Sequence, residues 1–229
     1  MIYLTGDTHG SFERISEFCH RFKTTKEDVM IILGDAGINY YEGKRAELLK
    51  KMLDDMPITF FCIHGNHEQR PYAIPTYHEE TWNGGMVYVE KKHPSILFGK
   101  DGEVYNLDGK KAIVIGGAYS VDKFYRLSRH YAWFDNEQPS DEIKKTVEDK
   151  LDTIGWKVDI VLTHTTPLKY EPVEVFLSMI DQSTVDKTTE QWLDKIEDRL
   201  DYHKWYCGHY HTSKKIDKLQ IMFEDYDTL

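Results

Sequence analysis

Short hydrophobic runs alternate with amphipathic segments along most of the chain. The runs are rich in β-branched and aromatic residues, which favours buried strands. We expect strands at Ile2–Leu4, Val29–Leu33, Ile58–Ile63, Met86–Val89, Ile96–Phe98, Val104–Leu107, Ala112–Ile115, Val158–Leu162, Trp205–Cys207 and Lys218–Phe223. In the amphipathic segments, apolar residues recur three and four positions apart, which is typical of helices with one buried face. We expect helices at about Phe12–Phe22, Lys44–Met56, Asp141–Ile154 and Glu190–Leu200. The alternation predicts a layered α/β domain.

The ends of the predicted helices carry capping signals. Ser11 and Ser140 precede the first and third helices, where a hydroxyl can accept a hydrogen bond from a free backbone N–H group. Thr188 and Gln191 have the spacing of a capping box at the start of the last helix. Pro57 marks the end of the second helix, because proline lacks the N–H group that a continuing helix needs.

Between residues 86 and 115 the pattern changes to several short β segments separated by turn signals. Asp101-Gly102 and Asp108-Gly109 are dipeptides that favour two-residue hairpin turns. We therefore expect antiparallel strands in this stretch, rather than parallel strands joined by helices.

Five of the predicted strands are followed directly by short polar motifs. The motifs are Gly6-Asp7-Thr8-His9-Gly10, Gly34-Asp35, Gly65-Asn66-His67-Glu68, Thr163-His164 and Gly208-His209-Tyr210-His211. In α/β sheets, ligand sites gather beyond the carboxyl ends of the strands, so we expect these side chains to lie close together. Their carboxylate, amide and imidazole groups suit two divalent metal ions that share a bridging carboxylate.

Most of these residues have a second interpretation when each motif is taken alone. Asp7 and His9 could form a hydrogen-bonded turn, and Asp35 could cap a helix. His164 could be a buried histidine of the core. The Gly-Asn-His-Glu and Gly-His-x-His motifs are more specific for a metal. A metal-free reading would require every strand end to imitate a ligand by chance.

Composition restricts the class of protein. The 229 residues suit one domain, and we expect a single domain over residues 1–229. The net charge of −10 weighs against sequence-independent nucleic-acid binding, so nucleic acid enters only as a substrate. No run reaches the ~20 apolar residues of a membrane span, and we expect no signal peptide. The widely spaced Cys19, Cys62 and Cys207 predict free thiols and a cytoplasmic location.

Taken in order, the five motifs resemble those of the calcineurin-like metallophosphoesterase superfamily, over positions 6 to 211. The resemblance implies a four-layer sandwich of two mixed β-sheets flanked by helices, with a dinuclear metal site at the carboxyl ends of the strands. It implies seven metal ligands in three roles: Asp7, His9 and His211 on the first ion, Asp35 as the bridge, and Asn66, His164 and His209 on the second ion. His67 would be the catalytic histidine, which contacts the phosphate without binding metal. The two divalent ions would be Mn, Fe, Zn, Ni or Co, with Mn favoured.

The resemblance also implies hydrolysis of a phosphorylated substrate. A hydroxide held between the ions would attack phosphorus in line, and His67 would protonate the leaving group. Phosphoprotein phosphatases of the superfamily carry an Asp three residues after the bridging one, followed by an Arg, where this chain has Ile38 and Asn39. We therefore favour a phosphodiesterase or small-molecule phosphatase. Two alternatives stay open: a serine/threonine-type phosphoprotein phosphatase, and a catalytically inactive metal-binding scaffold.

Two arginines follow the Gly116-Gly117-Ala118-Tyr119-Ser120 run. Arg126 and Arg129 are candidate substrate-binding residues, because guanidinium groups bind phosphate oxygens well. The alternative is a solvated basic loop.

Overall fold

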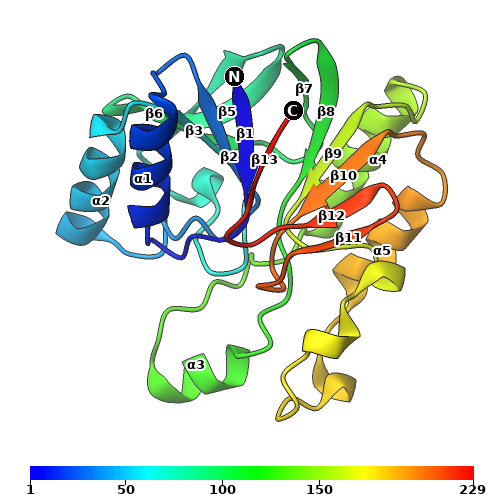
Figure 1. The fold of residues 1–229 in the computed structure, drawn as a ribbon. Helices are drawn as coiled ribbons and strands as arrows, with labels where there is room; N and C mark the ends of the chain where they lie inside the picture. Colours follow the sequence, from blue (N-terminus) through cyan, green and yellow to red (C-terminus); the bar gives the residue numbers. More distant parts are fainter.

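The computed structural model describes residues 1–229, which form two facing β-sheets flanked by helices (Figure 1). The seven-stranded sheet has the order β13-β1-β2-β3-β6-β5-β4. Its strands are β13 (Tyr226–Thr228), β1 (Ile2–Thr5), β2 (Val29–Ile32), β3 (Thr59–Cys62), β6 (His93–Gly99), β5 (Gly85–Glu90) and β4 (Tyr77–Trp82). The neighbouring strands β1, β2, β3 and β6 pair in parallel. The pairings of β13 with β1, of β6 with β5 and of β5 with β4 are antiparallel.

The six-stranded sheet has the order β11-β12-β10-β9-β8-β7. Its strands are β11 (Lys214–Ile216), β12 (Leu219–Ile221), β10 (Lys204–Cys207), β9 (Ile160–Thr163), β8 (Lys110–Ile115) and β7 (Val104–Leu107). The four central strands pair in parallel, with an antiparallel strand at each edge. Both sheets are therefore mixed.

Helices cover the outer faces of the two sheets. They are α1 (Glu13–Phe22) and α2 (Gly43–Asp55) on the first sheet, and α4 (Asp141–Thr153) and α5 (Thr188–Glu197) on the second (Figure 1). The helix α3 (Lys123–Arg129) stands apart, beyond one end of the sandwich (Figure 1). Short 3-10 turns lie at η1 (Pro71–Ala73), η2 (Leu168–Tyr170), η3 (Val173–Val175) and η4 (Gln182–Thr184). The predicted four-layer fold is confirmed.

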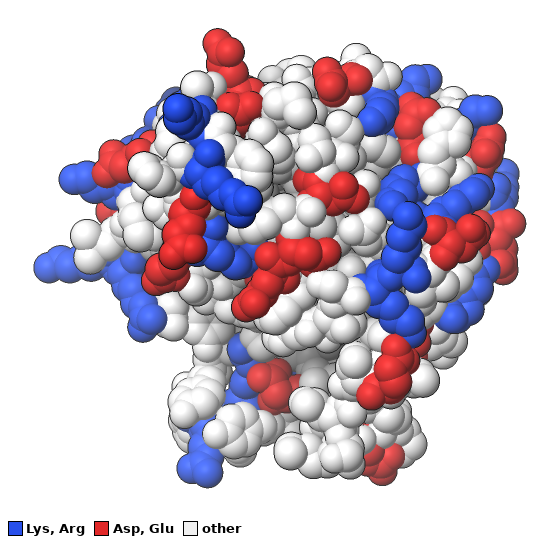
Figure 2. All heavy atoms as spheres, in the orientation of Figure 1, with Lys and Arg blue, Asp and Glu red and all other residues white.

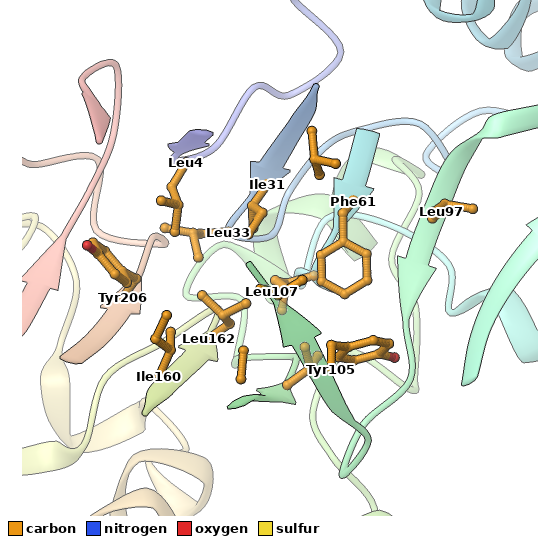
Figure 3. Packing of buried hydrophobic residues seen from close by; sticks show 14 of the residues in the cluster. Leu4, Ile31, Leu33, Phe61, Leu97, Tyr105, Leu107, Ile160, Leu162 and Tyr206 are labelled. Carbon is orange, nitrogen blue, oxygen red and sulfur yellow. The ribbon is translucent and has the colours of Figure 1, made fainter. Parts of the chain in front are cut away.

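Three hydrophobic clusters hold the layers together, and the alternation of side chains along each strand divides residues among them. In β2, Ile31 points between the sheets, whereas Met30 and Ile32 point toward α1 and α2. Strands that are buried on both faces read as continuous hydrophobic runs, as the sequence pattern indicated. Figure 3 shows side chains of the two sheets meeting in the central cluster.

The structure corrects one of the two predicted hairpins. Asp108-Gly109 joins β7 to β8 as expected, with both residues at positive φ. Asp101-Gly102 instead carries the chain from β6 in one sheet to β7 in the other. The Asp101 carboxylate accepts the N–H of Gly116 at 2.6 Å and pairs with the buried Arg70. These distant partners are invisible to a local turn signal.

Two of the predicted caps are also wrong. Ser140 caps α4 as expected, accepting the N–H of Ile143 at 3.3 Å. Ser11 does not cap α1, because its hydroxyl donates to Glu13 instead. At α5 the capping box is absent, and the N–H of Thr188 donates to the carboxylate of Asp186 at 3.0 Å.

The sequence pattern also missed three strands and one helix: β4, β11, β13 and α3. The strand β4 is mainly polar, and α3 exposes most of its residues, so neither shows a clear hydrophobic period. The predicted strand at 218–223 is present as β12, but it is not the last one. The chain continues into β13, which pairs antiparallel with β1 at the edge of the other sheet.

Two further sequence expectations bear on the class of protein. All three cysteines are free and buried, as expected. None of the helices combines the length and the apolar character that crossing a membrane would require.

We expect Phe61→Ala to lower the free energy of unfolding by about 3–5 kcal/mol, because it leaves a cavity between the sheets. Phe61 is fully buried, stacks on Trp82 at 4.8 Å between ring centroids and meets Tyr105 edge-on. Phe124→Ala is the matched control, since its ring is 69% exposed. Denaturant unfolding measures both. Equal losses for the two variants would contradict a core that depends on the contact between the sheets.

Candidate metal centre

Both sheets contribute motifs to one end of the sandwich. Asp7 and His9 follow β1, Asp35 follows β2, and Asn66 and His67 follow β3. The second sheet supplies the remaining histidines, His164 after β9 and His209 and His211 after β10. The first sheet therefore provides both carboxylates and the amide, and the second provides three imidazoles.

The first group of donors consists of Asp7, His9 and His211. One ligand atom of each lies within 4.8 Å of the others. The Nε2 atoms of His9 and His211 are 2.8 Å apart. Asp7 Oδ2 lies 3.3 Å from His211 Nε2, yet it is buried and has no hydrogen-bond partner. An unsatisfied buried carboxylate oxygen is costly, and a cation bound between these side chains would satisfy it.

The second group of donors surrounds His164. Its Nε2 atom lies 2.8 Å from Asn66 Oδ1, and its ring centroid lies 4.9 Å from that of His209. His164 is fully buried, and its Nδ1 atom lies 2.8 Å from the carbonyl oxygen of Leu33. A hydrogen bond from Nδ1 to that carbonyl leaves Nε2 free as the ligand atom.

Asp35 lies between the two groups. Its Oδ2 atom is 3.9 Å from His9 Nδ1, and its Oδ1 atom is 3.6 Å from His164 Nε2. A carboxylate oxygen of Asp35 also lies within 4.8 Å of ligand atoms of Asp7, in the first group, and of His164, in the second. Asp35 is therefore close enough to both groups to act as a bridging carboxylate. Asp35 is only 2% exposed, so water does not compensate its charge.

Backbone N–H groups fix the orientation of both carboxylates. Asp35 Oδ1 accepts the N–H of His67 at 2.7 Å, and Asp7 Oδ1 accepts the N–H of His209 at 2.9 Å. The approach requires glycine: a Cβ atom at Gly65 would lie 2.0 Å from Asp35 Oδ1, and one at Gly208 would lie 2.3 Å from Asp7 Oδ1. The glycines of these motifs thus serve to position the acids.

Four of the predicted ligands have left-handed backbone conformations. They are His9 (φ 48°), Asp35 (φ 47°), His209 (φ 70°) and His211 (φ 47°). Such conformations are unfavourable for residues with a side chain, and they persist only where the surrounding structure enforces them. Their concentration at one site is typical of functional positions.

Burial and neighbouring groups set the charge of the donors. Burial raises the pKa of Asp35, but the imidazoles of His164 and His67 outweigh this effect and hold the pKa below its usual value. Burial lowers the pKa of His209 to about 3. At neutral pH the carboxylate is therefore ionised and the His209 imidazole neutral, which are the forms that bind cations. The donor set fits divalent ions such as Mn, Fe, Co, Ni and Zn.

His67 contacts Arg126 of α3, a pairing that the sequence analysis missed. Arg126 is buried and donates from Nη2 to His67 Nδ1. Its Nε donates to Asp122 Oδ2 at 2.9 Å, and its Nη1 donates to the carbonyl oxygen of Ala132 at 2.7 Å. Asp122 Oδ1 lies 3.9 Å from His67 Nε2. The spacing of four residues between Asp122 and Arg126 predicts this ion pair, but nothing in it indicates the contact with His67.

The other sequence candidates around His67 lie elsewhere. Ile38, at the position of the acid found in phosphoprotein phosphatases, is fully buried in the cluster under α1 and α2. Arg129 lies on the exposed side of α3, with its guanidinium 5.7 Å from the centre of the Tyr125 ring. The structure brings Arg126 to the site but leaves Arg129 away from it.

Glu68, the last residue of its motif, connects two of the motif loops. Its Oε1 atom accepts the N–H groups of Ala36 and Gly65 at 3.3 and 3.4 Å. Burial, reinforced by the Asp35 charge, raises the pKa of Glu68 to about 8. A carboxyl group that stays largely neutral can act as this brace without repelling Asp35.

Comparison with known proteins yields one family match. The family model described as calcineurin-like phosphoesterase matches residues 1–213, which include all five motifs. Among solved structures, a protein serine/threonine phosphatase from Saccharomyces cerevisiae with similarity to human phosphatase PP5 is 16% identical, with a TM-score of 0.34. The match covers 97% of this chain and 66% of that one, so this chain spans slightly less than two thirds of that protein. No curated protein matches the chain.

We expect Gly65→Ala to weaken the binding of Mn²⁺ by about 10–100-fold, the usual effect of disturbing groups that orient a ligand. The added methyl group would displace Asp35 Oδ1. Gly84→Ala is the control, because its Cβ meets nothing within 4 Å although its φ of +85° strains the backbone. Titration calorimetry gives both affinities. Normal Mn²⁺ binding by Gly65→Ala would contradict the positioning of Asp35 through this close approach.

Proposed function

The chain belongs to the calcineurin-like phosphoesterase family, and we propose that it is a metal-dependent hydrolase of phosphoester bonds formed by a single domain over residues 1–229. One observation carries the proposal: a carboxylate oxygen of the buried Asp35 lies within 4.8 Å of ligand atoms of Asp7, in the first group of donors, and of His164, in the second. A scaffold without catalytic activity has no chemical need for this arrangement.

We assign the donors to two ions. Asp7, His9 and His211 would hold the first, and Asn66, His164 and His209 the second, with Asp35 shared between them. Two divalent ions held in this way would activate water at neutral pH and neutralise charge on a phosphate group. Mn²⁺ is our first choice for assay, because the donors are mainly imidazole and oxygen.

His67 has the position and the protonation state of a hydrogen-bond donor to the substrate. Because Arg126 donates to Nδ1, that nitrogen must carry the lone pair, and the ring proton is held on Nε2. The Nε2–H group can then donate to a phosphate oxygen or to the departing oxygen of the ester. In phosphoprotein phosphatases an acid at the position of Ile38 orients the catalytic histidine. Here we assign the orientation of His67 to Arg126 and Asp122.

This arrangement favours a phosphodiesterase or a small-molecule phosphatase over a phosphoprotein phosphatase. The acid and the arginine of the phosphoprotein enzymes are Ile38 and Asn39 here. Ile38 is fully buried, and the Asn39 side chain accepts a hydrogen bond from the Tyr77 hydroxyl at 2.9 Å. Both positions are therefore committed to the fold rather than to the substrate.

We expect the Mn²⁺-loaded protein to hydrolyse p-nitrophenyl phosphate, its bis ester, or both, and Asp35→Asn to lose bound metal and activity together. The amide would remove the charge that both ions share. Asp135→Asn is the control, an exposed aspartate remote from the donors in sequence. Metal content and initial rates report the two properties. A folded Asp35→Asn variant with full metal and full activity would refute the bridging role, and a metal-loaded native protein inert toward all esters would favour the scaffold.

We expect His67→Ala to keep its metals and lose about 10²–10⁴-fold in kcat. Arg126→Met should lower kcat about tenfold in the native background but have little further effect in His67→Ala, because it acts through His67. Lys145→Met, which removes another helical pair at the same spacing, is the control. The ¹⁵N shifts of the His67 ring in the Zn²⁺ form should show a single tautomer, lost in Arg126→Met. Additive kinetic effects with an unchanged tautomer would leave Arg126 as a merely structural residue.

A further inference from the structure

A cavity of ≈ 400 Å³ opens beside the candidate metal centre. Five residues of the centre line it: Asp35, Asn66, His67, His209 and His211. This volume is within the range of about 300–1,000 Å³ that small-molecule sites occupy. A phosphate group held at the centre would therefore have space next to it for the organic part of its ester.

The wall of this cavity is apolar and comes from two segments outside the sheets. Most of it belongs to the stretch between η2 and α5, which supplies Val175, Phe176, Leu177, Ile180 and Val185. The Phe176 ring lies nearly parallel to that of Tyr210, with 6.1 Å between centroids. Val121, just before α3, also lines the cavity.

The charged residues of the wall are all acidic. They are Asp122, Glu171, Asp186 and Glu190, and no lysine or arginine lines the cavity. Glu171 is compensated by Lys187 at 2.7 Å, and Asp122 by Arg126 at 2.9 Å, so the wall as a whole is neutral to negative. Figure 2 shows the two lower projections as mainly uncharged, with acidic and basic atoms side by side between them.

We propose that this cavity binds the organic group of the substrate ester, and that this group is apolar and either uncharged or positively charged. The proposal rests on the proposed phosphoester hydrolysis for the placement of the phosphate. A second anionic group, such as the next phosphate of a nucleic acid chain, would meet carboxylates and apolar side chains without a cation to pair with. We therefore expect polyanionic substrates to bind more weakly than esters whose organic group is uncharged or positively charged.

Three phenyl phosphates of similar size test the charge of the organic group. Their para substituents are isopropyl, aminomethyl and carboxymethyl, in which a saturated carbon separates any charge from the ring. We expect kcat/KM for the first two esters to exceed that for the carboxymethyl ester by at least about tenfold, because the carboxymethyl group would bring an unpaired negative charge against acidic and apolar side chains. A factor of ten corresponds to about 1.4 kcal/mol. The matching benzylphosphonates, which are not hydrolysed, should show the same order of Kd on the Mn²⁺-loaded protein. Equal or better binding of the carboxymethyl compound would overturn the proposal.

A pair of variants on one turn assigns the preference to the cavity wall. Val175→Lys places a cation at the cavity. It should lower the ratio of kcat/KM for the isopropyl ester to kcat/KM for the carboxymethyl ester about tenfold. Val173→Lys carries the same charge on the same turn, but Val173 does not line the cavity, so it should leave the preference unchanged. Both side chains are exposed, at 41% and 66%, so neither change should disturb folding. Equal effects of the two lysines would overturn the proposal.

The two readouts separate the proposal from the proposed function. Hydrolysis of all three esters without preference, together with indifferent phosphonate binding, would refute the cavity assignment and leave phosphoester hydrolysis standing. Selective phosphonate binding without hydrolysis of any ester would refute the hydrolase and support the cavity assignment.

Discussion

The candidate centre depends on two hydrogen bonds from backbone N–H groups to buried carboxylates. One joins His67 to Asp35, between neighbouring strands of the first sheet. The other joins His209 to Asp7 and connects the first sheet to the second. Each needs a glycine beside it, at position 65 or 208, because a single methyl group would occupy the space of the carboxylate oxygen. These bonds hold Asp7 Oδ2 close to His211 and Asp35 Oδ1 close to His164.

The backbone conformations and the unpaired oxygen of the site raise the free energy of the folded protein. The packing of the sandwich around the site compensates for this cost. Four ligand residues are in the left-handed region, and Asp7 has a buried oxygen without a hydrogen-bond partner. Features of this kind cost of order 1–3 kcal/mol each and persist where rigid surroundings enforce them. Here the surrounding structure is the cluster of 17 buried residues between the sheets. The Glu68 carboxyl group adds hydrogen bonds to two of the motif loops. Bound cations would relieve the electrostatic part of this cost, so metal binding and stability are expected to be coupled.

The sequence predicted the layered fold and the meeting of the five motifs because both follow from local patterns. Hydrophobic runs such as Val29–Leu33 mark buried strands, and polar residues at their carboxyl ends mark a shared edge. It failed where tertiary partners decide the outcome. Asp101 does not form the predicted hairpin turn, because its carboxylate pairs with the distant Arg70. The strand β13 is defined only by its pairing with β1. The sequence shows that Ile38 stands where phosphoprotein phosphatases have an acid. It does not show that Arg126 contacts His67 instead, because Arg126 is 59 positions away on a helix with no clear hydrophobic period.

The bridging role that we propose for Asp35 requires two cations close to each other. Low-temperature electron paramagnetic resonance of the protein with two equivalents of Mn²⁺ tests it most directly, because neighbouring Mn²⁺ ions couple magnetically. A bridging Asp35 should give the multiline spectrum of a coupled pair, since metal pairs in such sites lie about 3.5–4 Å apart. A spectrum that contains only the hyperfine sextet of isolated Mn²⁺, with both equivalents bound, would contradict it.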